Sequence, residues 1–196
     1  GFLIVLLLYL PSTAINAGII IDGKLDEEEW KEAKQITSLY EVFPYTLNPV
    51  EDIRTVILIQ ESSEGIFLGF KNYQSNESMR SQSHQRDNER SIADKNGVTI
   101  DFDADKLSGY QFFVSSSGSI GDATYRNENE RSYDWDADWL SAASTEDGVW
   151  YSEMFIPWTV APMKAQSGEQ RKVRMAFYRM LAGPQRVIAT IKGSSY

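Results

Sequence analysis

Residues 53–73, IRTVILIQESSEGIFLGFKNY, decide the fold class. Two apolar runs, 53–60 and 66–73, flank the polar segment ESSEG, whose serines and glycine are typical of a tight turn. Each run has the length of a strand and is apolar on both faces at its centre, as expected for a strand that is packed on both sides. The pattern predicts an antiparallel hairpin in the middle of a sheet.

Short apolar runs separated by turns continue along the chain and predict about ten strands. Residues 25–33 instead favour a short helix, with Asp26 as its N-cap, Glu29 completing a capping box, and Leu25, Trp30 and Ala33 on its buried side. A chain that consists mainly of hairpins and one helix buries its apolar faces best when two antiparallel sheets pack face to face. The predicted fold is therefore an all-β, two-sheet antiparallel β-sandwich with one short N-terminal helix. Besides the hairpin, the expected strands are 19–21, 98–103, 110–115, 119–125, 139–144, 149–156, 172–180 and 186–191.

Composition excludes several classes of function. The 196 residues include 28 acids and 19 Lys and Arg, and no basic run is interleaved with aromatics, so nucleic acid is not an expected partner. The absence of cysteine excludes disulfides, thiolate zinc sites and thiol nucleophiles. The single histidine, His84, excludes multi-histidine metal sites and most catalytic triads. Calcium, which takes oxygen ligands, remains the metal to consider.

Residues 1–17 differ in composition from the rest of the chain. GFLIVLLLYL is an apolar run that is short for a membrane span, and Pro11 and small residues follow it, as in the cleavage region of a secretory signal peptide. The alternative is a buried first strand. We expect a truncated signal peptide at 1–17, one domain at 18–196, and an exported protein that is periplasmic, outer-membrane-associated or extracellular.

Two acidic motifs, DFDAD and DWDAD, repeat the same spacing. Alternate residues of a strand point the same way about 7 Å apart, so each motif is either a calcium site completed by loop oxygens or a solvent-facing strand end. A helix-loop-helix calcium motif is excluded because Lys106 and Phe112 occupy the positions of its glycine and its glutamate. The candidate ligands are Asp101, Asp103, Asp105, Asp134, Asp136 and Asp138.

Aromatic residues concentrate in and near SYDWDADWL at 132–140. A flat ring that faces solvent can pack on the C–H face of a sugar, but most aromatics of a sandwich lie in the core. Strand positions favour core roles for Trp139 and Trp150, while Trp135 and Tyr133, in a loop, suit either role.

The case for catalysis is weak. Nucleophile motifs, phosphate loops and zinc patterns are missing, so the chain is not expected to be an enzyme, although the full-length protein could carry a glycoside hydrolase domain. Glu153 lies between apolar neighbours on its strand, and we expect it to be buried, with either a raised pKa or, preferably, an arginine partner.

Four segments in order resemble the family 9 carbohydrate-binding modules: IDGKLDEEEWKEA, GVTIDFDADKLSGYQFFVSSSGSIGDA, YDWDADWLSAASTEDGVWYSEMFIPW and RMAFYR. They are most similar to a subgroup of uncharacterised bacterial proteins in which this domain precedes an outer-membrane β-barrel. The resemblance implies a β-sandwich that binds a glycan or sugar terminus, often with structural calcium, through an aromatic pair and neighbouring polar residues. The positions carried over are Tyr73, Trp135 and Trp139 for the aromatic platform, and Arg86, Asn88 and Asn127 for hydrogen bonding; Tyr133 remains a sugar candidate from its loop position.

The function that this resemblance implies is a non-catalytic carbohydrate-binding module of an exported protein, linked to carbohydrate catabolism or uptake. One alternative is a structural or protein-interaction domain before an outer-membrane barrel, with the long polar loop 74–96 as its contact. A minor alternative is a haem-binding sandwich, in which His84 would supply the histidine ligand.

Overall fold

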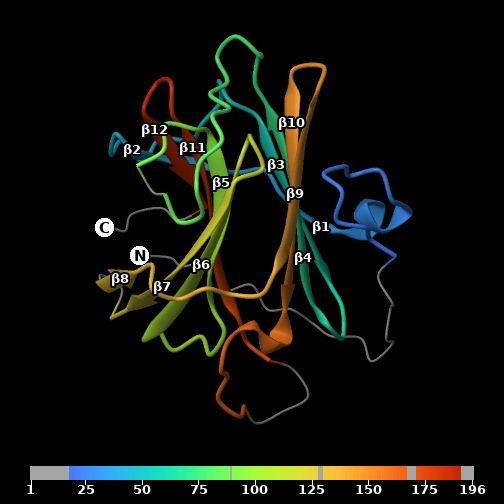
Figure 1. Ribbon diagram of the computed structural model, residues 1–196, viewed down its shortest axis with the longest axis vertical. Helices are drawn as coiled ribbons and strands as arrows, with labels where there is room; N and C mark the ends of the chain where they lie inside the picture. Colours follow the sequence, from blue (N-terminus) through green and yellow to red (C-terminus); the bar gives the residue numbers. More distant parts are fainter. Residues whose placement is uncertain (1–17, 89, 128–129, 167–170, 191–196) are drawn as a thin grey trace.

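The computed structural model describes residues 18–88, 90–127, 130–166 and 171–190, which form two antiparallel sheets packed face to face (Figure 1). This architecture confirms the predicted sandwich. The expected signal peptide at 1–17 lies outside the described residues.

The two sheets differ in size. The five-stranded sheet has the order β1 (Lys34–Ile36), β3 (Thr55–Glu61), β4 (Gly65–Tyr73), β10 (Val149–Pro157) and β9 (Leu140–Glu146). The seven-stranded sheet has the order β2 (Tyr40–Phe43), β12 (Arg186–Ala189), β11 (Arg174–Leu181), β5 (Lys95–Asp101), β6 (Ser108–Ser115), β7 (Ile120–Arg126) and β8 (Glu130–Ser132). The predicted hairpin at 53–73 is β3 and β4, paired from Thr55 with Asn72 to Glu61 with Ile66.

Three of the observed strands, β1, β2 and β8, are not predicted by the sequence. They have only three or four residues and lie at sheet edges, where no alternation of buried and exposed side chains marks a strand. The predicted strand at 19–21 is wrong. These residues are unpaired coil, and Ile19 and Ile21 pack beside Trp30 instead.

The expected N-terminal helix is a 3-10 helix, η1 (Glu28–Glu32), and its predicted capping is wrong. The N-cap is Glu27, which makes no side-chain capping bond, so Asp26 caps nothing and no capping box forms. The Glu27 carboxylate instead accepts the Ile20 N–H at 2.9 Å. Neither η1 nor η2 (Trp158–Val160), the two helices in the described part of the chain, is long and apolar enough to cross a membrane.

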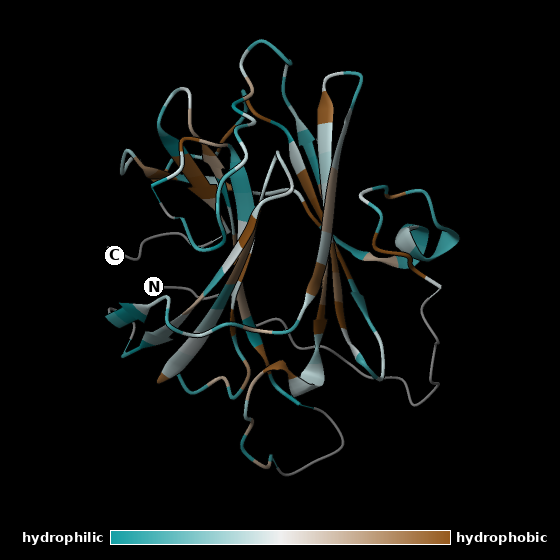
Figure 2. Ribbon diagram, viewed as in Figure 1, coloured by the Kyte–Doolittle hydropathy of each residue, from teal (hydrophilic) through white to brown (hydrophobic). Residues whose placement is uncertain are grey.

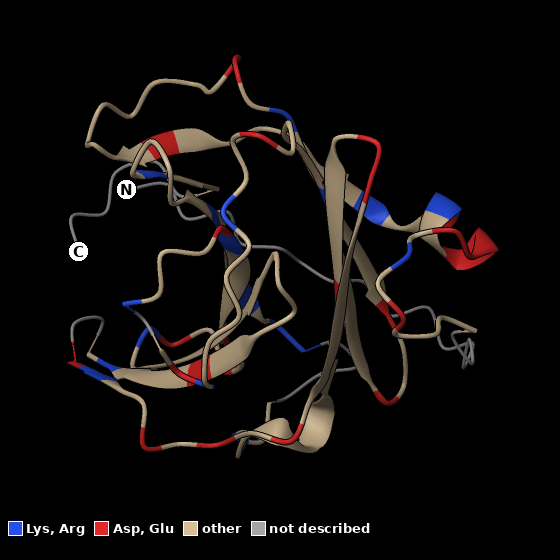
Figure 3. Ribbon diagram, turned by 45° about the horizontal axis from the view of Figure 1, so that its top comes forward, with Lys and Arg blue, Asp and Glu red and all other residues tan. Residues whose placement is uncertain are grey.

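The main core lies between the sheets, where the alternating residues of each strand meet. Phe70 of β4 and Phe177 of β11 contact each other edge to face across this layer, with 6.2 Å between their ring centroids. Apolar residues accordingly concentrate along the strands (Figure 2), and charged residues gather in loops, turns and η1 (Figure 3).

One arginine lies in the core between the sheets, although most charged residues lie in loops and turns. Arg179 shares the inward side of β11 with Phe177 and is completely buried. Its guanidinium donates to Thr55 Oγ1 at 2.8 Å and to Gln74 Oε1 at 2.6 Å, which links the two sheets. Burial lowers the pKa of Arg179 to about 10, so it remains a cation at neutral pH.

The outer face of the five-stranded sheet is covered by residues 18–33 (Figure 1). Trp30 of η1 packs with Leu58 of β3 and Phe67 of β4 in a second apolar cluster. Gly69 makes this close approach possible, because a Cβ at that position would lie 2.6 Å from Leu25 and 3.3 Å from the Trp30 ring.

Glu153 of β10 fastens this cover to the sheet. Its buried carboxylate accepts the backbone N–H groups of Asp22 at 3.0 Å and Gly23 at 2.7 Å, and the Trp30 indole N–H at 3.2 Å. The preferred prediction of an arginine partner is therefore wrong, because N–H donors of the N-terminal segment occupy that place. Burial raises the pKa of Glu153 to about 7, and the two backbone donors offset only part of that effect.

Stability should therefore fall as the pH rises through this range. The folded state holds the Glu153 proton up to a pKa of about 7, whereas the ordinary pKa is 4.5. Unfolding consequently becomes easier by up to about 3 kcal/mol between pH 4 and pH 8. Urea unfolding across this range should show a shallower pH dependence for Glu153→Gln than for the wild type. Glu146→Gln, an exposed change at the β9–β10 turn, should keep the wild-type dependence. Parallel curves for the wild type and Glu153→Gln would contradict the assignment.

Candidate functional site

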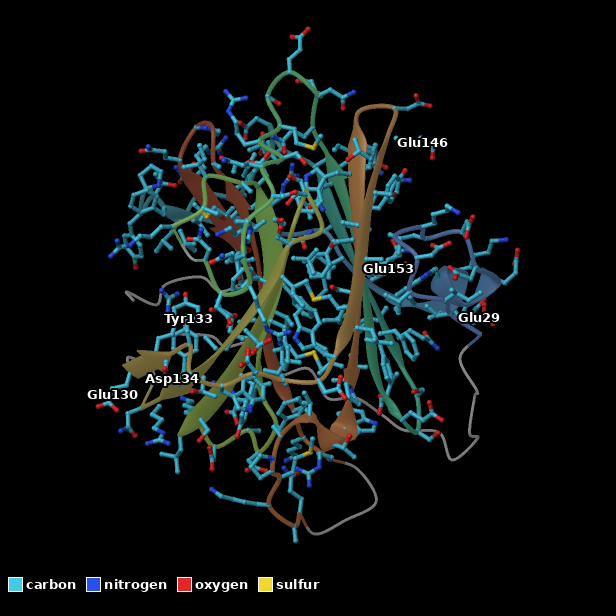
Figure 4. The ribbon with its side chains drawn as sticks, in the orientation of Figure 1. Glu29, Glu130, Tyr133, Asp134, Glu146 and Glu153 are labelled. Atoms are coloured by element: carbon cyan, nitrogen blue, oxygen red, sulfur yellow. The ribbon has the colours of Figure 1, made fainter. Side chains whose placement is uncertain are left out.

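The outer face of the seven-stranded sheet carries a group of tyrosines. Strand alternation puts Phe177 inward and Tyr178 outward on β11, and Asp122 inward and Tyr125 outward on β7. Tyr133 follows β8 on the same side of the sheet (Figure 4). We call this group the tyrosine face; its members are Gln111, Tyr125, Arg131, Tyr133 and Tyr178.

Hydrogen bonds and ring contacts connect the members of the tyrosine face. The Tyr125 hydroxyl lies 3.4 Å from Gln111 Oε1 and 3.3 Å from Arg131 Nη1. The Arg131 guanidinium lies 4.9 Å from the Tyr133 ring centroid and 5.9 Å from that of Tyr125. The pKa of Tyr178 lies above its ordinary value, mainly through burial and further through the neighbouring Tyr125 and Tyr133. Its phenol therefore remains a neutral hydrogen-bond donor at neutral pH.

Two glycines let aromatic rings lie against this sheet. A Cβ at Gly97 would stand 2.8 Å from the Tyr178 hydroxyl, and a Cβ at Gly121 would stand 2.2 Å from the Phe113 ring. Both distances are too short for a side chain. The bare backbone at these positions makes room for Tyr178 and Phe113 on the outer face.

The predicted aromatic platform is split between different parts of the fold. Tyr133 joins the tyrosine face. Trp135 packs edge-on against Tyr110 and Phe112, at 5.0 and 5.8 Å, at the margin of the inner core. Trp139 is only 6% exposed and donates its indole N–H to Asp122 at 2.9 Å, so it is a core residue and lies outside the candidate platform.

Tyr73 lies on the other sheet, at the end of β4, with the Arg54 guanidinium 4.4 Å from its ring centroid. It therefore cannot act together with the tyrosine face on one short glycan. Asn127 occupies the turn between β7 and β8 with a φ of 49°, a conformation that asparagine tolerates. Asn88 is exposed, and its carbonyl accepts from Lys95 Nζ at 3.2 Å.

Arg86, an expected sugar contact, binds a buried acid through its guanidinium while 35% of its side chain stays exposed. It forms an ion pair with Asp122, a fully buried residue, and donates to the Ala137 carbonyl at 2.9 Å. The Asp122 carboxylate also accepts the Ala137 N–H at 3.2 Å and the Trp139 indole N–H. These contacts form an anchor that joins the loop before β5, strand β7 and the segment before β9.

The acids of DFDAD are paired with cations. Asp103 accepts from Arg171 Nη1 at 3.3 Å and from the Lys164 N–H at 2.9 Å, and Asp105 pairs with Lys164 Nζ. Asp101 accepts the N–H of Lys106 at 2.8 Å. These bonds tie the β5–β6 turn to the segment after η2.

The acids of DWDAD face outward and are exposed. Asp136 lies 3.2 Å from Arg86, and Asp134 accepts from the Ser132 hydroxyl at 2.9 Å. Asp138 is exposed, and no contact between these three carboxylates is found in the part of the chain that the structure describes. Across residues 18–88, 90–127, 130–166 and 171–190, no three acids or histidines converge as metal ligands.

The long polar loop is held along its length by backbone bonds. The His84 N–H donates to Ser119 Oγ at 3.0 Å, and the His84 ring Nδ1 lies 2.8 Å from the Gln85 carbonyl. Asp94, at the end of the loop, is completely buried and accepts the N–H groups of Arg80 at 3.0 Å and Ala182 at 2.7 Å. The loop is therefore part of the folded domain.

Sequence reasoning passed over Gln111, Arg131 and Tyr178. The outward orientation of Tyr178 could have been predicted from the sequence, because the alternation that puts Phe177 inward puts Tyr178 outward. Arg131 belongs to a three-residue edge strand with no apolar signal, so only the pairing of Tyr125 with Arg131 reveals it.

Comparisons with known proteins agree with this geometry at the level of the fold. The sequence matches no protein-family model and no curated relative. A family 9 carbohydrate-binding module from Caldicellulosiruptor kristjanssonii in complex with cellotriose is similar in structure. Its TM-score is 0.58 at 12% identity, covering 87% of this chain and 77% of that chain. The chain has the fold of a family 9 carbohydrate-binding module.

Two further structures share this family 9 fold. One is a family 9 module from the same organism in complex with glucose, with a TM-score of 0.59, 10% identity, and coverage of 90% of this chain and 83% of that chain. The other is a candidate carbohydrate-binding protein from Bacteroides uniformis, with a TM-score of 0.61, 13% identity, and coverage of 85% and 81%. At these identities the likeness concerns the fold alone.

Removing the Asp122 carboxylate should destabilise this family 9 fold. In Asp122→Ala, the N–H groups of Ala137 and Trp139 and the partly exposed Arg86 guanidinium lose their acceptor, and leaving a buried donor unsatisfied typically costs about 1–3 kcal/mol. Chemical denaturation should show a loss of this size. Asp138→Ala removes an exposed acid of the neighbouring segment and should change stability by less than about 0.5 kcal/mol. Equal losses in the two variants would refute the anchor role of Asp122.

Proposed function

We propose that the chain is a non-catalytic glycan-binding module of an exported protein that serves carbohydrate catabolism or uptake. The observation that carries the proposal is the tyrosine face, which combines aromatic rings with an amide and a guanidinium on one outer sheet surface. The structural neighbours that bind cellotriose and glucose support the same class of ligand.

The chemistry of the tyrosine face suits a sugar. Aromatic rings offer flat apolar surfaces for the C–H face of a pyranose, and the phenol groups of tyrosines add polar tips at the edge of those surfaces. The Tyr125 hydroxyl donates to Gln111 Oε1 and accepts from Arg131, and these bonds fix its direction while its oxygen keeps capacity to accept from a sugar hydroxyl. An open sheet surface fits a chain end or an extended glycan better than a buried small molecule.

Export, calcium and a membrane partner belong to the same proposal. The apolar segment 1–17 supports export to the periplasm, the outer membrane or the cell exterior. Asp134 and Asp138 are the acids most open to a calcium ion, since those of DFDAD are occupied by cations and N–H groups. A following outer-membrane barrel rests on the sequence resemblance.

A glycan array followed by calorimetry, with and without calcium, tests the proposal. We expect saturable binding to at least one glycan and a loss of at least about tenfold in affinity for Tyr133→Ala and Tyr125→Ala, because removing a stacked ring and its hydroxyl removes more than about 1.4 kcal/mol. Tyr73→Ala, on the opposite sheet, and Tyr45→Ala, an exposed tyrosine beyond the far edge strand β2, should bind as the wild type does.

The same variants also distinguish this proposal from the alternative sites and functions. Binding that is lost in Tyr73→Ala but kept in Tyr133→Ala would move the site to the five-stranded sheet. A stable protein that binds no glycan would overturn the proposal in favour of an interaction domain. Circular dichroism of each variant establishes that the fold is intact.

A further inference from the structure

A hollow of about 300 Å³ opens at the end of the sandwich, between the β5–β6 turn and the segment after η2. Its accessible apolar wall is formed by Pro162 and Met163, and its polar lining includes Asp103, Ser108, Tyr110 and Lys164. The volume is at the lower end of small-molecule pockets, which span about 300–1,000 Å³. A ligand of this hollow is therefore small.

The hollow is separate from the tyrosine face. In the ladder between β6 and β7, Tyr110 pairs with Thr124 and the adjacent Gly109 pairs with Tyr125. Tyr110 shares the inner side with Phe112, while Tyr125 lies on the outer side. The two tyrosines thus stand on neighbouring strands but serve opposite faces of one sheet.

Charge in and around the hollow is balanced within the described part of the chain. Asp101 lies 4.0 Å from Arg174, Asp103 lies 3.3 Å from Arg171, and Asp105 pairs with Lys164. Each carboxylate has a cation beside it, so neither a cationic nor an anionic ligand finds an excess of opposite charge. The hollow favours a neutral ligand.

The polar groups left to meet that ligand are hydroxyls. Ser108 is exposed, and the Tyr110 hydroxyl has no hydrogen-bond partner among the described residues. The Tyr110 ring is held in place by Phe102, at 5.7 Å, and by Trp135, at 5.0 Å. Burial and the nearby Asp103 raise the pKa of Tyr110, which keeps its phenol neutral and able to donate.

We propose that this hollow is a second binding site, which takes a single neutral sugar ring with its hydroxyls on Tyr110 and Ser108 and its apolar side on Pro162 and Met163. The combination of a fixed aromatic ring, paired charges, open hydroxyls and an apolar wall matches a ligand that is polar at its edge and apolar on its face. The site is independent of the glycan surface proposed above, since it lies on the other face of the sheet.

Titration of the full chain with glucose, galactose, mannose and xylose, one at a time, followed by amide NMR, tests this site. We expect saturable shifts at Ser108, Tyr110 and Lys164 with at least one of these sugars. Tyr110→Phe keeps the ring and removes one hydroxyl, so it should weaken that binding about fivefold, the effect of one neutral hydrogen bond. Tyr125→Phe makes the same chemical change on the adjacent strand and should leave these shifts and their midpoint unchanged.

The outcomes separate this site from the tyrosine face. No saturable shift at the three amides with any of the four sugars would overturn the second site, as would equal binding by Tyr110→Phe and the wild type. Shifts that Tyr125→Phe weakens and Tyr110→Phe does not would assign the sugar to the tyrosine face instead. Failure of the array with polysaccharides, combined with Tyr110-dependent binding of a monosaccharide, would leave this site standing without the outer one.

Discussion

The buried carboxylate of Asp122 holds three separate parts of the chain in one place. Arg86 comes from the long polar loop, Ala137 and Trp139 come from the segment before β9, and all of them bond to this one group on β7. A buried carboxylate must have such partners, because burial without them would cost several kcal/mol. Tyr133 lies in the same segment, four residues before the anchored Ala137.

The two outer faces of the sandwich are packed against different parts of the protein. Residues 18–33 cover the face of the five-stranded sheet, where Gly69 leaves room for Trp30 and Glu153 accepts the N–H groups of the cover. On the seven-stranded sheet, Gly97 and Gly121 leave room for the rings of Tyr178 and Phe113. Glycine thus permits close packing on both outer faces, of the N-terminal segment on one sheet and of aromatic rings on the other.

The candidate site could be predicted only in part from the sequence. The stretch SYDWDADWL pointed to both Tyr133 and Trp135, and loop position alone did not separate these two residues. Their division follows from the chain path after β8, which carries Trp135 to the inner edge beside Tyr110 and keeps Tyr133 beside Arg131. Arg86 looked like a ligand contact because an arginine in a polar loop gives no sign of a buried acid such as Asp122.

Hydrophobic periodicity by itself determined the β-sandwich, the central hairpin and the inward side of most strands. A two-residue repeat of apolar residues shows which side chains of a strand are buried on folding. It did not determine which buried polar groups meet, since Glu153 and the N-terminal turn are more than a hundred residues apart. Only the tertiary structure decided that Glu153 bonds N–H groups rather than an arginine, and that Gln111, Tyr125, Arg131, Tyr133 and Tyr178 share one surface. Such meetings depend on the order and register of strands, which local sequence does not encode.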